Sequence, residues 1–308
     1  MDFGLFTPVT KSKKTQGRRA AMDCCGQTET ETELPYELPE GLGDPLETFE
    51  RLVLGIQSAD PAMRYEATHR ARQLLSVERE PPVIPAIESG IVPVLLASLT
   101  SKQSTDKIKF EACWAITNVA RSDRTEYVVE EGAVPVVIKQ LSSSFIDLKE
   151  QAVWCLGNIA GDGPIYRDLL LRQNVLPMFI QIIVECFKGD HISVLRNTTW
   201  ALSNLFRGKP PSALQYIQEA LPIVTTLLST STDSDVLLDS AWALCSMLER
   251  DGDGVDAVLL SGVMTHVISK LNATPESAPL ITPLLRCAGT IISGDHKQTQ
   301  AMLDLNVI

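Results

Sequence analysis

Arg196-Asn197-Thr198-Thr199-Trp200-Ala201-Leu202-Ser203-Asn204-Leu205-Phe206-Arg207 is the most informative stretch of this 308-residue chain. Its apolar residues have helical spacing, and Trp200 and Asn204 stand four positions apart, so both side chains lie on one helical face. A large flat aromatic ring and a side-chain amide therefore lie next to each other on the surface of this predicted helix.

The same pair recurs elsewhere in the chain. Trp114 precedes Asn118, and Trp154 precedes Asn158, each by four residues, whereas Trp242 has no amide at that distance. The chain has no other tryptophans, and the four lie 40, 46 and 42 residues apart. A fixed period of this length indicates a repeat architecture.

A second motif recurs at nearly the same period and predicts a joint between helices. Gly or Asn suits a helix C-terminal cap, and Pro suits the first turn of the following helix. The copies, spaced by 42, 42, 45 and 43 residues, are Gly90-Ile91-Val92-Pro93, Gly132-Ala133-Val134-Pro135, Asn174-Val175-Leu176-Pro177, Glu219-Ala220-Leu221-Pro222 and Gly262-Val263-Met264-Thr265.

Each period is therefore expected to hold a short helix, a medium helix and a longer Trp-bearing helix. Three helices in about 42 residues are typical of an armadillo repeat. We predict an all-α armadillo solenoid, a right-handed superhelix, over residues 46–308, whose third helices line a concave face with the amides exposed. Its repeats are expected near 46–80, 83–121, 124–162, 165–208, 211–251 and 254–294, and residues 295–308 begin a seventh.

The first 45 residues are expected to be disordered in isolation. Residues 1–22 carry a basic cluster from Lys11 to Arg19, whereas residues 23–50 hold nine carboxylates and no basic residue. Prolines and glycines interrupt the acidic part, and neither part can build an apolar core. A solvated tail is the default interpretation of such charge runs.

Composition narrows the class of partner. The formal net charge of -11 and the pI near 4.9 argue against nucleic acid and anionic membranes as partners and favour a basic one. No apolar run approaches the ~20 residues of a membrane span, and no signal core begins the chain, so a soluble, intracellular protein without membrane insertion is expected. Four cysteines in apolar helical stretches, Cys113, Cys155, Cys245 and Cys287, are expected to be buried thiols.

The repeats resemble those of the importin-α family, the adaptors that carry nuclear localisation signals. The resemblance covers most of residues 46–308 and is carried by residues 110–118, 150–154, 157–163 and 200–205, with 71–76 matching a first repeat. It implies binding of proteins with basic nuclear localisation signals in the groove of repeats two to four, for import into the nucleus. It also implies a location in cytoplasm and nucleus. Because the sequence has no convincing Ser/His/Asp arrangement, nucleotide-binding loop or metal-ligand spacing, no enzymatic activity, cofactor or metal is expected. The basic tail would be a remnant of the importin-β-binding region.

The chemistry of a Trp/Asn ladder can be argued from the residues themselves. A row of Asn amides can donate to and accept from the backbone of an extended peptide, whatever its sequence. Parallel indoles leave slots for the apolar stem of Lys or Arg, and cation–π attraction adds roughly 0.5–2 kcal/mol per contact. Such a surface would hold a basic peptide.

The resemblance adds further positions to the ladder. Asp162, four residues after Asn158, matches the aspartate that selects one lysine, and Thr125, Gln151 and Asp239 match other groove positions. The predicted peptide site therefore consists of Trp114, Asn118, Thr125, Gln151, Trp154, Asn158, Asp162, Trp200, Asn204, Asp239 and Trp242.

Alternatives stay open at this stage. A lone Trp at helical spacing is more often a core residue, but three Asn partners contribute nothing to an apolar core. Asp162 could be a turn residue between two glycines. Ser246, Thr290 and Val77 depart from the family pattern. The alternative function is an armadillo scaffold or cargo sink that binds partners without productive transport.

Overall fold

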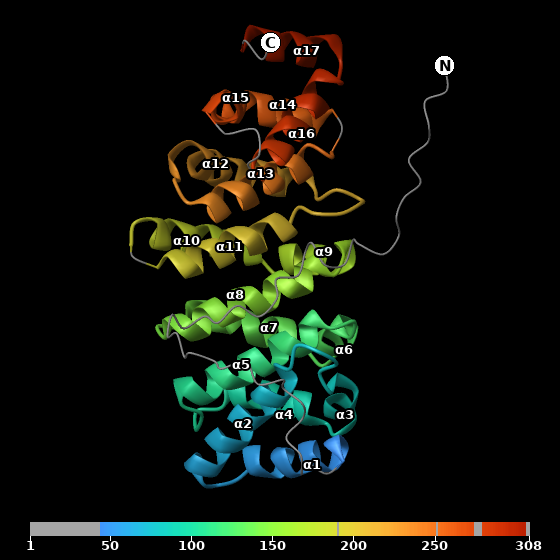
Figure 1. Ribbon diagram of the computed structural model, residues 1–308, viewed down its shortest axis with the longest axis vertical. Helices are drawn as coiled ribbons and strands as arrows, with labels where there is room; N and C mark the ends of the chain where they lie inside the picture. The colour runs from blue at the N-terminus through green and yellow to red at the C-terminus, as the bar shows by residue number, and fades with distance from the viewer. Residues whose placement is uncertain (1–43, 190, 251, 274–278, 306–308) are drawn as a thin grey trace, which may run out of the picture.

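The computed structural model describes residues 44–189, 191–250, 252–273 and 279–305. In these residues seventeen α-helices and one short 3-10 helix stack along a single axis (Figure 1), and no strand occurs among them. The predicted all-α helical solenoid is confirmed. The basic and acidic tail predicted for residues 1–45 lies almost wholly outside the described residues.

The helices follow the predicted repeats. By repeat they are α1 (Pro45–Ile56) and α2 (Pro61–Leu75); α3 (Val83–Glu88), α4 (Ile91–Thr100) and α5 (Asp106–Arg121); α6 (Thr125–Glu130), α7 (Ala133–Ile138), η1 (Lys139–Ser142) and α8 (Ile146–Gly161); α9 (Pro164–Arg172), α10 (Val175–Phe187) and α11 (Ile192–Asn204); α12 (Leu214–Thr230) and α13 (Ser234–Met247); α14 (Asp253–Leu260), α15 (Val263–Ala273) and α16 (Ile281–Ile292); and α17 (His296–Asp304), which begins a seventh.

Four of the five predicted joints have the expected geometry. Gly90, Gly132, Asn174 and Gly262 all have positive φ, between 60° and 81°, and a helix begins at the next residue. The left-handed conformation turns the chain sharply between the first and second helices, and it suits Gly and Asn.

The joint predicted at Glu219 is wrong. Helix α12 runs through this position and contains Pro222 in its interior. Glu219 stands where the other repeats have Gly or Asn, and it has no comparable tendency to adopt the left-handed conformation. The first two helices of the fifth repeat are therefore fused into one.

The core lies between successive helices of one type. We call α2, α5, α8, α11, α13 and α16 the ladder helices, because each packs against the next along the stack. Their inward faces carry small and branched apolar residues, such as Ala112, Val153, Leu202 and Leu244, all fully buried. The four cysteines predicted to be buried thiols are buried and free, and burial raises the pKa of Cys155 to about 12.

One charged residue, Arg167 on α9, is fully buried and ties two repeats together. Its guanidinium donates to the carbonyl oxygens of Arg207 and Gly208, both at 3.0 Å, and of Pro210 at 2.7 Å. Its charge is paired with Asp168 at 2.9 Å. These bonds hold the connection that follows α11, and with it the end of a ladder helix.

Within the described ranges no single helix is long and apolar enough to cross a membrane. Two bent pairs, α9 with α10 and α14 with α15, have sufficient combined length and apolar character. Leu170, Phe179, Val258 and Val267, which lie in these pairs, are buried in the core of the stack.

Candidate peptide-binding site

The four tryptophans lie on successive ladder helices, α5, α8, α11 and α13. Trp154 and Trp200 are 3% and 4% exposed, whereas Trp114 and Trp242 are half-buried. Gly157 on α8 faces the indole of Trp200, and a Cβ at this glycine would collide with the ring. Gly157, the third residue after Trp154, therefore leaves the space in which the indole of Trp200 packs.

Two of the three amides reach back to the preceding ladder helix. Asn204 donates from Nδ2 to the carbonyl oxygen of Gly157 at 3.1 Å, and Asn118 donates from Nδ2 to Oγ of Ser76 at 3.0 Å. Asn118, Asn158 and Asn204 are 4%, 0% and 2% exposed. The expectation of exposed amides was therefore wrong: all three amides have almost no exposed surface, and two of them bond to the preceding repeat.

Helix α8 is distinguished by polar atoms without partners. Neither Oδ1 nor Nδ2 of Asn158, nor Nε1 of Trp154, nor Oε1 of Gln151 has a hydrogen-bond partner within the described part of the chain. A buried polar group left unpaired costs roughly 1–3 kcal/mol. These positions are one helical turn apart, so α8 presents a row of unsatisfied donors and acceptors.

The remaining predicted residues belong to the same faces or to the adjoining turns. Gln151 is buried and donates from Nε2 to Oγ1 of Thr117 at 2.8 Å, which ties α8 to α5. Thr125, also buried, donates to the carbonyl oxygen of Ala120 at 2.9 Å and closes the turn after α5. Asp239 lies buried on α13, one turn before Trp242.

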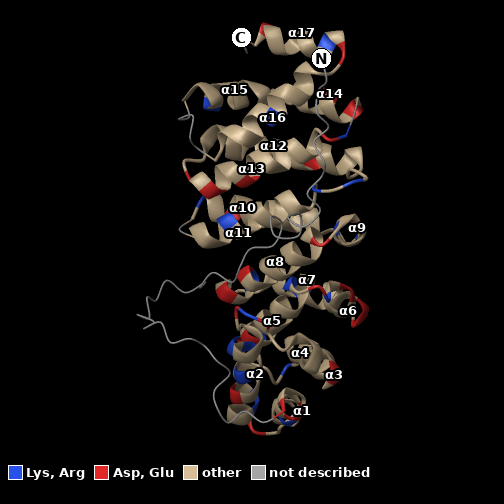
Figure 2. Ribbon diagram, turned by 45° about the vertical axis from the view of Figure 1, so that its right-hand side comes forward, with Lys and Arg blue, Asp and Glu red and all other residues tan. Residues whose placement is uncertain are grey.

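Asp162 is the C-terminal cap residue of α8 and is half-buried. It belongs to a group of carboxylates near the ladder. Burial, followed by the charges of Glu126, Asp162 and Glu130, raises the pKa of Tyr166 above its ordinary value. Acidic positions, coloured red on the ribbon, recur along α6 (Figure 2), so a basic ligand near Asp162 would meet negative charge.

The sequence interpretation missed the side chains at the two ends of the ladder. Arg72 on α2 and Arg286 on α16 stand at the Trp position of their repeats. The guanidinium carbon of Arg72 lies 4.5 Å from the ring centroid of Trp114, and that of Arg286 lies 5.5 Å from that of Trp242. The repeat register alone could have placed both arginines beside the terminal indoles.

A second missed feature links α8 to α11. Glu150 is buried and accepts hydrogen bonds from Oγ of Ser193, at 3.1 Å, and from Nδ2 of Asn197, at 2.5 Å. Burial raises the pKa of Glu150, although these bonds lower it in part. The carboxyl positions the two helices that carry Trp154 and Trp200.

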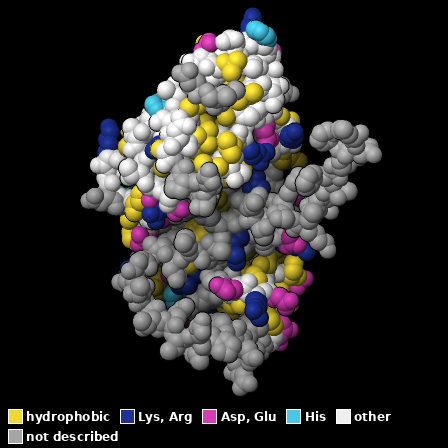
Figure 3. Space-filling model, turned by 45° about the horizontal axis from the view of Figure 1, so that its top comes forward, with side chains coloured by type: hydrophobic (Ala, Val, Ile, Leu, Met, Phe, Trp, Pro, Cys, Tyr) yellow, Lys and Arg dark blue, Asp and Glu magenta, His cyan; other side chains and the backbone are white. Residues whose placement is uncertain are grey.

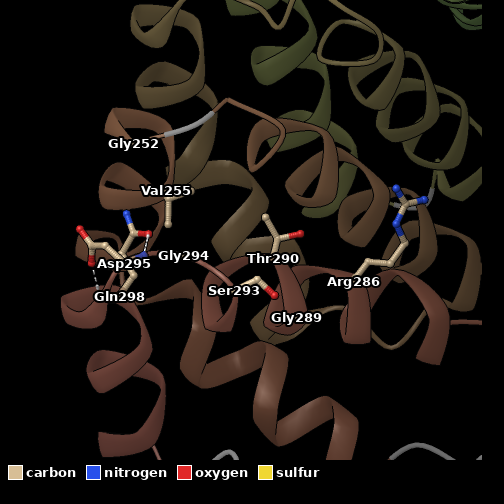
Figure 4. Close-up of a pocket in the computed structure, with 9 residues that line it drawn as sticks. All are labelled: Gly252, Val255, Arg286, Gly289, Thr290, Ser293, Gly294, Asp295 and Gln298. Atoms are coloured by element: carbon tan, nitrogen blue, oxygen red, sulfur yellow. Dashed lines mark hydrogen bonds between the residues drawn. The ribbon is translucent and has the colours of Figure 1, made fainter. Parts of the chain in front are cut away.

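A pocket of about 770 Å³ lies at the C-terminal end of the stack (Figure 4). Arg286, Thr290 and Ser293 of α16 and its turn line one side, and Val255, Asp295 and Gln298 line the other. Hydrophobic side chains also gather on the surface toward this end (Figure 3), and Leu285 and Leu303 are 55% and 45% exposed. Among the described residues no cluster of side chains could hold a metal ion.

Comparisons with known proteins agree with this architecture. The sequence model of the Armadillo/beta-catenin-like repeat matches residues 79–121, 122–161 and 164–207. An engineered protein superposes with a TM-score of 0.74 at 23% identity, over 84% of this chain and 62% of its own. A designed armadillo repeat protein in complex with the peptide (KR)4 superposes with a TM-score of 0.67 at 20% identity, over 83% and 98%. The chain is an armadillo-repeat protein.

Its curated relatives are more specific. It is 42% identical over 265 residues to importin subunit alpha-1b of Oryza sativa subsp. japonica, covering 85% of this chain and 48% of the relative. It is 39% identical over 296 residues to importin subunit alpha-3 of Arabidopsis thaliana, covering 96% and 53%. The chain is therefore similar to importin-α proteins over most of its own length, as a divergent member of that family would be, and it spans about half the length of these relatives.

Proposed function

We propose that this protein is an import adaptor that holds a basic nuclear localisation signal in extended form across α5, α8, α11 and α13. The observation that carries the proposal is the row of unpaired polar atoms on α8, at Gln151, Trp154 and Asn158. An extended peptide backbone has donors and acceptors along its edges, and it would satisfy them. Similarity to importin-α proteins supports the same ligand.

Specificity would come from the indoles and the carboxylates. The aliphatic stem of Lys or Arg fits against an indole face, and its charge is attracted to the ring. Asp162 and Asp239 would receive the charged ends, and the net charge of -11 favours encounter with a basic partner. Side-chain contacts of this kind select basic residues, while the amides hold any sequence.

The proposed function also includes delivery of the bound protein to the nucleus. The basic cluster within residues 1–22 is the candidate contact for importin-β, and shuttling between cytoplasm and nucleus follows from that role. Direct binding of importin-β to the chain separates an import adaptor from a scaffold or sink that only holds its partners.

A charge reversal at Asp162 tests the peptide site. We expect a short basic peptide with a central Lys to bind wild type at one site, and Asp162→Lys to weaken it roughly tenfold or more, because the lysine then meets a positive charge. Glu88→Lys, an exposed position on α3, makes the same change in net charge as a control. Equal loss in both variants, measured by calorimetry, would indicate only a general charge effect, and equal affinities would remove Asp162 from the site.

A further inference from the structure

Arg72 is held over the first indole of the ladder by neighbouring polar groups. Its Nε donates to Oε2 of Glu111 at 2.7 Å, and one terminal nitrogen lies 3.1 Å from Nδ1 of His69. His69 Nδ1 is also 3.0 Å from Oε1 of Glu111, and its ring stacks on Tyr65. Side-chain exposures of 16% for Arg72 and 7% for Glu111 show that the pair is largely removed from solvent.

This arrangement reproduces what a ladder slot would offer to a ligand. The guanidinium of Arg72 lies 4.5 Å from the centroid of the Trp114 ring, and a carboxylate binds its charge. An indole face with an acid at its edge is the combination that captures a basic side chain. Here the basic side chain belongs to the protein itself and comes from the preceding repeat.

We propose that Arg72 is a built-in occupant of the first slot and a specificity-determining residue for the peptide site. It closes the face of Trp114 that is turned toward α2, so a bound peptide places its basic residues only in the slots that lie between Trp114 and Trp242. A further basic residue beyond Trp114 gains no stacking contact and meets a fixed positive charge. This inference rests on the proposed function. It adds that the series of bound basic residues stops at Trp114.

The role of Arg72 differs from that of a simple structural ion pair. Removing the Arg72 side chain would leave Trp114 and Glu111 as an open pocket for an arginine supplied from outside. Arg72→Ala opens this pocket fully, and Arg72→Gln leaves a side chain that can donate to Glu111 but carries no charge to stack. Arg72→Ala combined with Glu111→Gln removes the acid as well, and Arg72→Lys keeps a cation as the matched control.

The test compares peptides that share one basic core. Each is extended at its N-terminus or its C-terminus through a Gly-Ser spacer by either Arg or Ala, so that both binding directions are covered. In calorimetric titrations we expect wild type and Arg72→Lys to gain nothing from the added Arg. Arg72→Ala or Arg72→Gln should bind one Arg-extended peptide roughly 3- to 10-fold more tightly than its Ala counterpart. The gain should largely disappear in the double variant.

A second measurement separates this inference from the proposed function. The indole Nε1–H resonance of Trp114, assigned by Trp114→Phe, is followed while arginine amide is added without any peptide. A shift in Arg72→Ala and none in wild type supports a closed slot even if the basic core peptide fails to bind, which would overturn the proposed function alone. If the core peptide binds but neither variant gains from the added Arg, or if wild type and variant respond alike to arginine amide, Arg72 does not close the slot.

Discussion

At the scale of single residues, the ladder depends on small residues as much as on large ones. Gly157 was recognised in the sequence only as part of a family motif, yet its missing side chain leaves room for the indole of Trp200. The spacing of Trp and Asn predicted which side chains share a face. It could not predict that the amides are buried, because burial depends on how closely neighbouring helices approach.

Substituting Gly157 by Ala should destabilise the protein and disturb the site. The added methyl group would meet the Trp200 ring in a packed core, which typically costs about 1–3 kcal/mol. Gly289→Ala on α16 is the matched control, because a Cβ there meets nothing within 4 Å. It should stabilise the helix by roughly 0.5–1 kcal/mol. The free energies of unfolding of the two variants, measured by chemical denaturation, test this prediction. Equal effects of the two substitutions would contradict the packing described for Gly157.

At the scale of helices, the local sequence predicted most of the joints between helices correctly and one of them wrongly. A left-handed Gly or Asn marks four joints correctly, whereas the Pro222 motif alone predicted a break that α12 does not contain. The pairing of Glu150 with Asn197 was not predicted, since two residues on separate helices share no local pattern. Arg72, in contrast, could have been placed by extending the Trp register one repeat toward the N-terminus.

The buried carboxyl of Glu150 gives the α8–α11 contact a pH dependence. Burial raises the pKa of Glu150 above its ordinary value of 4.5, so the unfolded chain releases this proton first as pH rises. The folded state should therefore lose stability, relative to Glu150→Gln, as pH rises from below 4.5 through the raised pKa. Glutamine has no charge to bury and can keep both hydrogen-bond contacts.

Unfolding free energies of wild type and Glu150→Gln, measured from pH 4 to pH 7.5, should diverge in favour of the variant as pH rises and then run parallel. Glu88→Gln, at an exposed position, should follow wild type throughout. A constant offset between wild type and Glu150→Gln across the range would mean that the carboxyl titrates normally in the folded state.

At the scale of the whole molecule, stacking converts separate helices into one continuous site. Each ladder helix packs on the next, so three Trp/Asn pairs from different repeats are held in line. The period of the tryptophans predicted this arrangement, because a solenoid places equivalent residues side by side. The sequence could not show which amide lacks a partner, since that depends on contacts made between repeats.

Asn158 therefore offers the most direct test of the account. A basic peptide is titrated against wild type, Asn158→Ala and, as a control for amide truncation, Asn272→Ala at an exposed position on α15, and unfolding free energies are measured on the same samples. Binding should fall roughly 10- to 100-fold in Asn158→Ala alone, since each lost hydrogen bond is worth about 0.5–1.5 kcal/mol. Its stability should hold or rise, because two unpaired buried atoms are removed. Unchanged affinity together with a stability loss of several kcal/mol would place Asn158 in the core and contradict a peptide-binding role for the ladder.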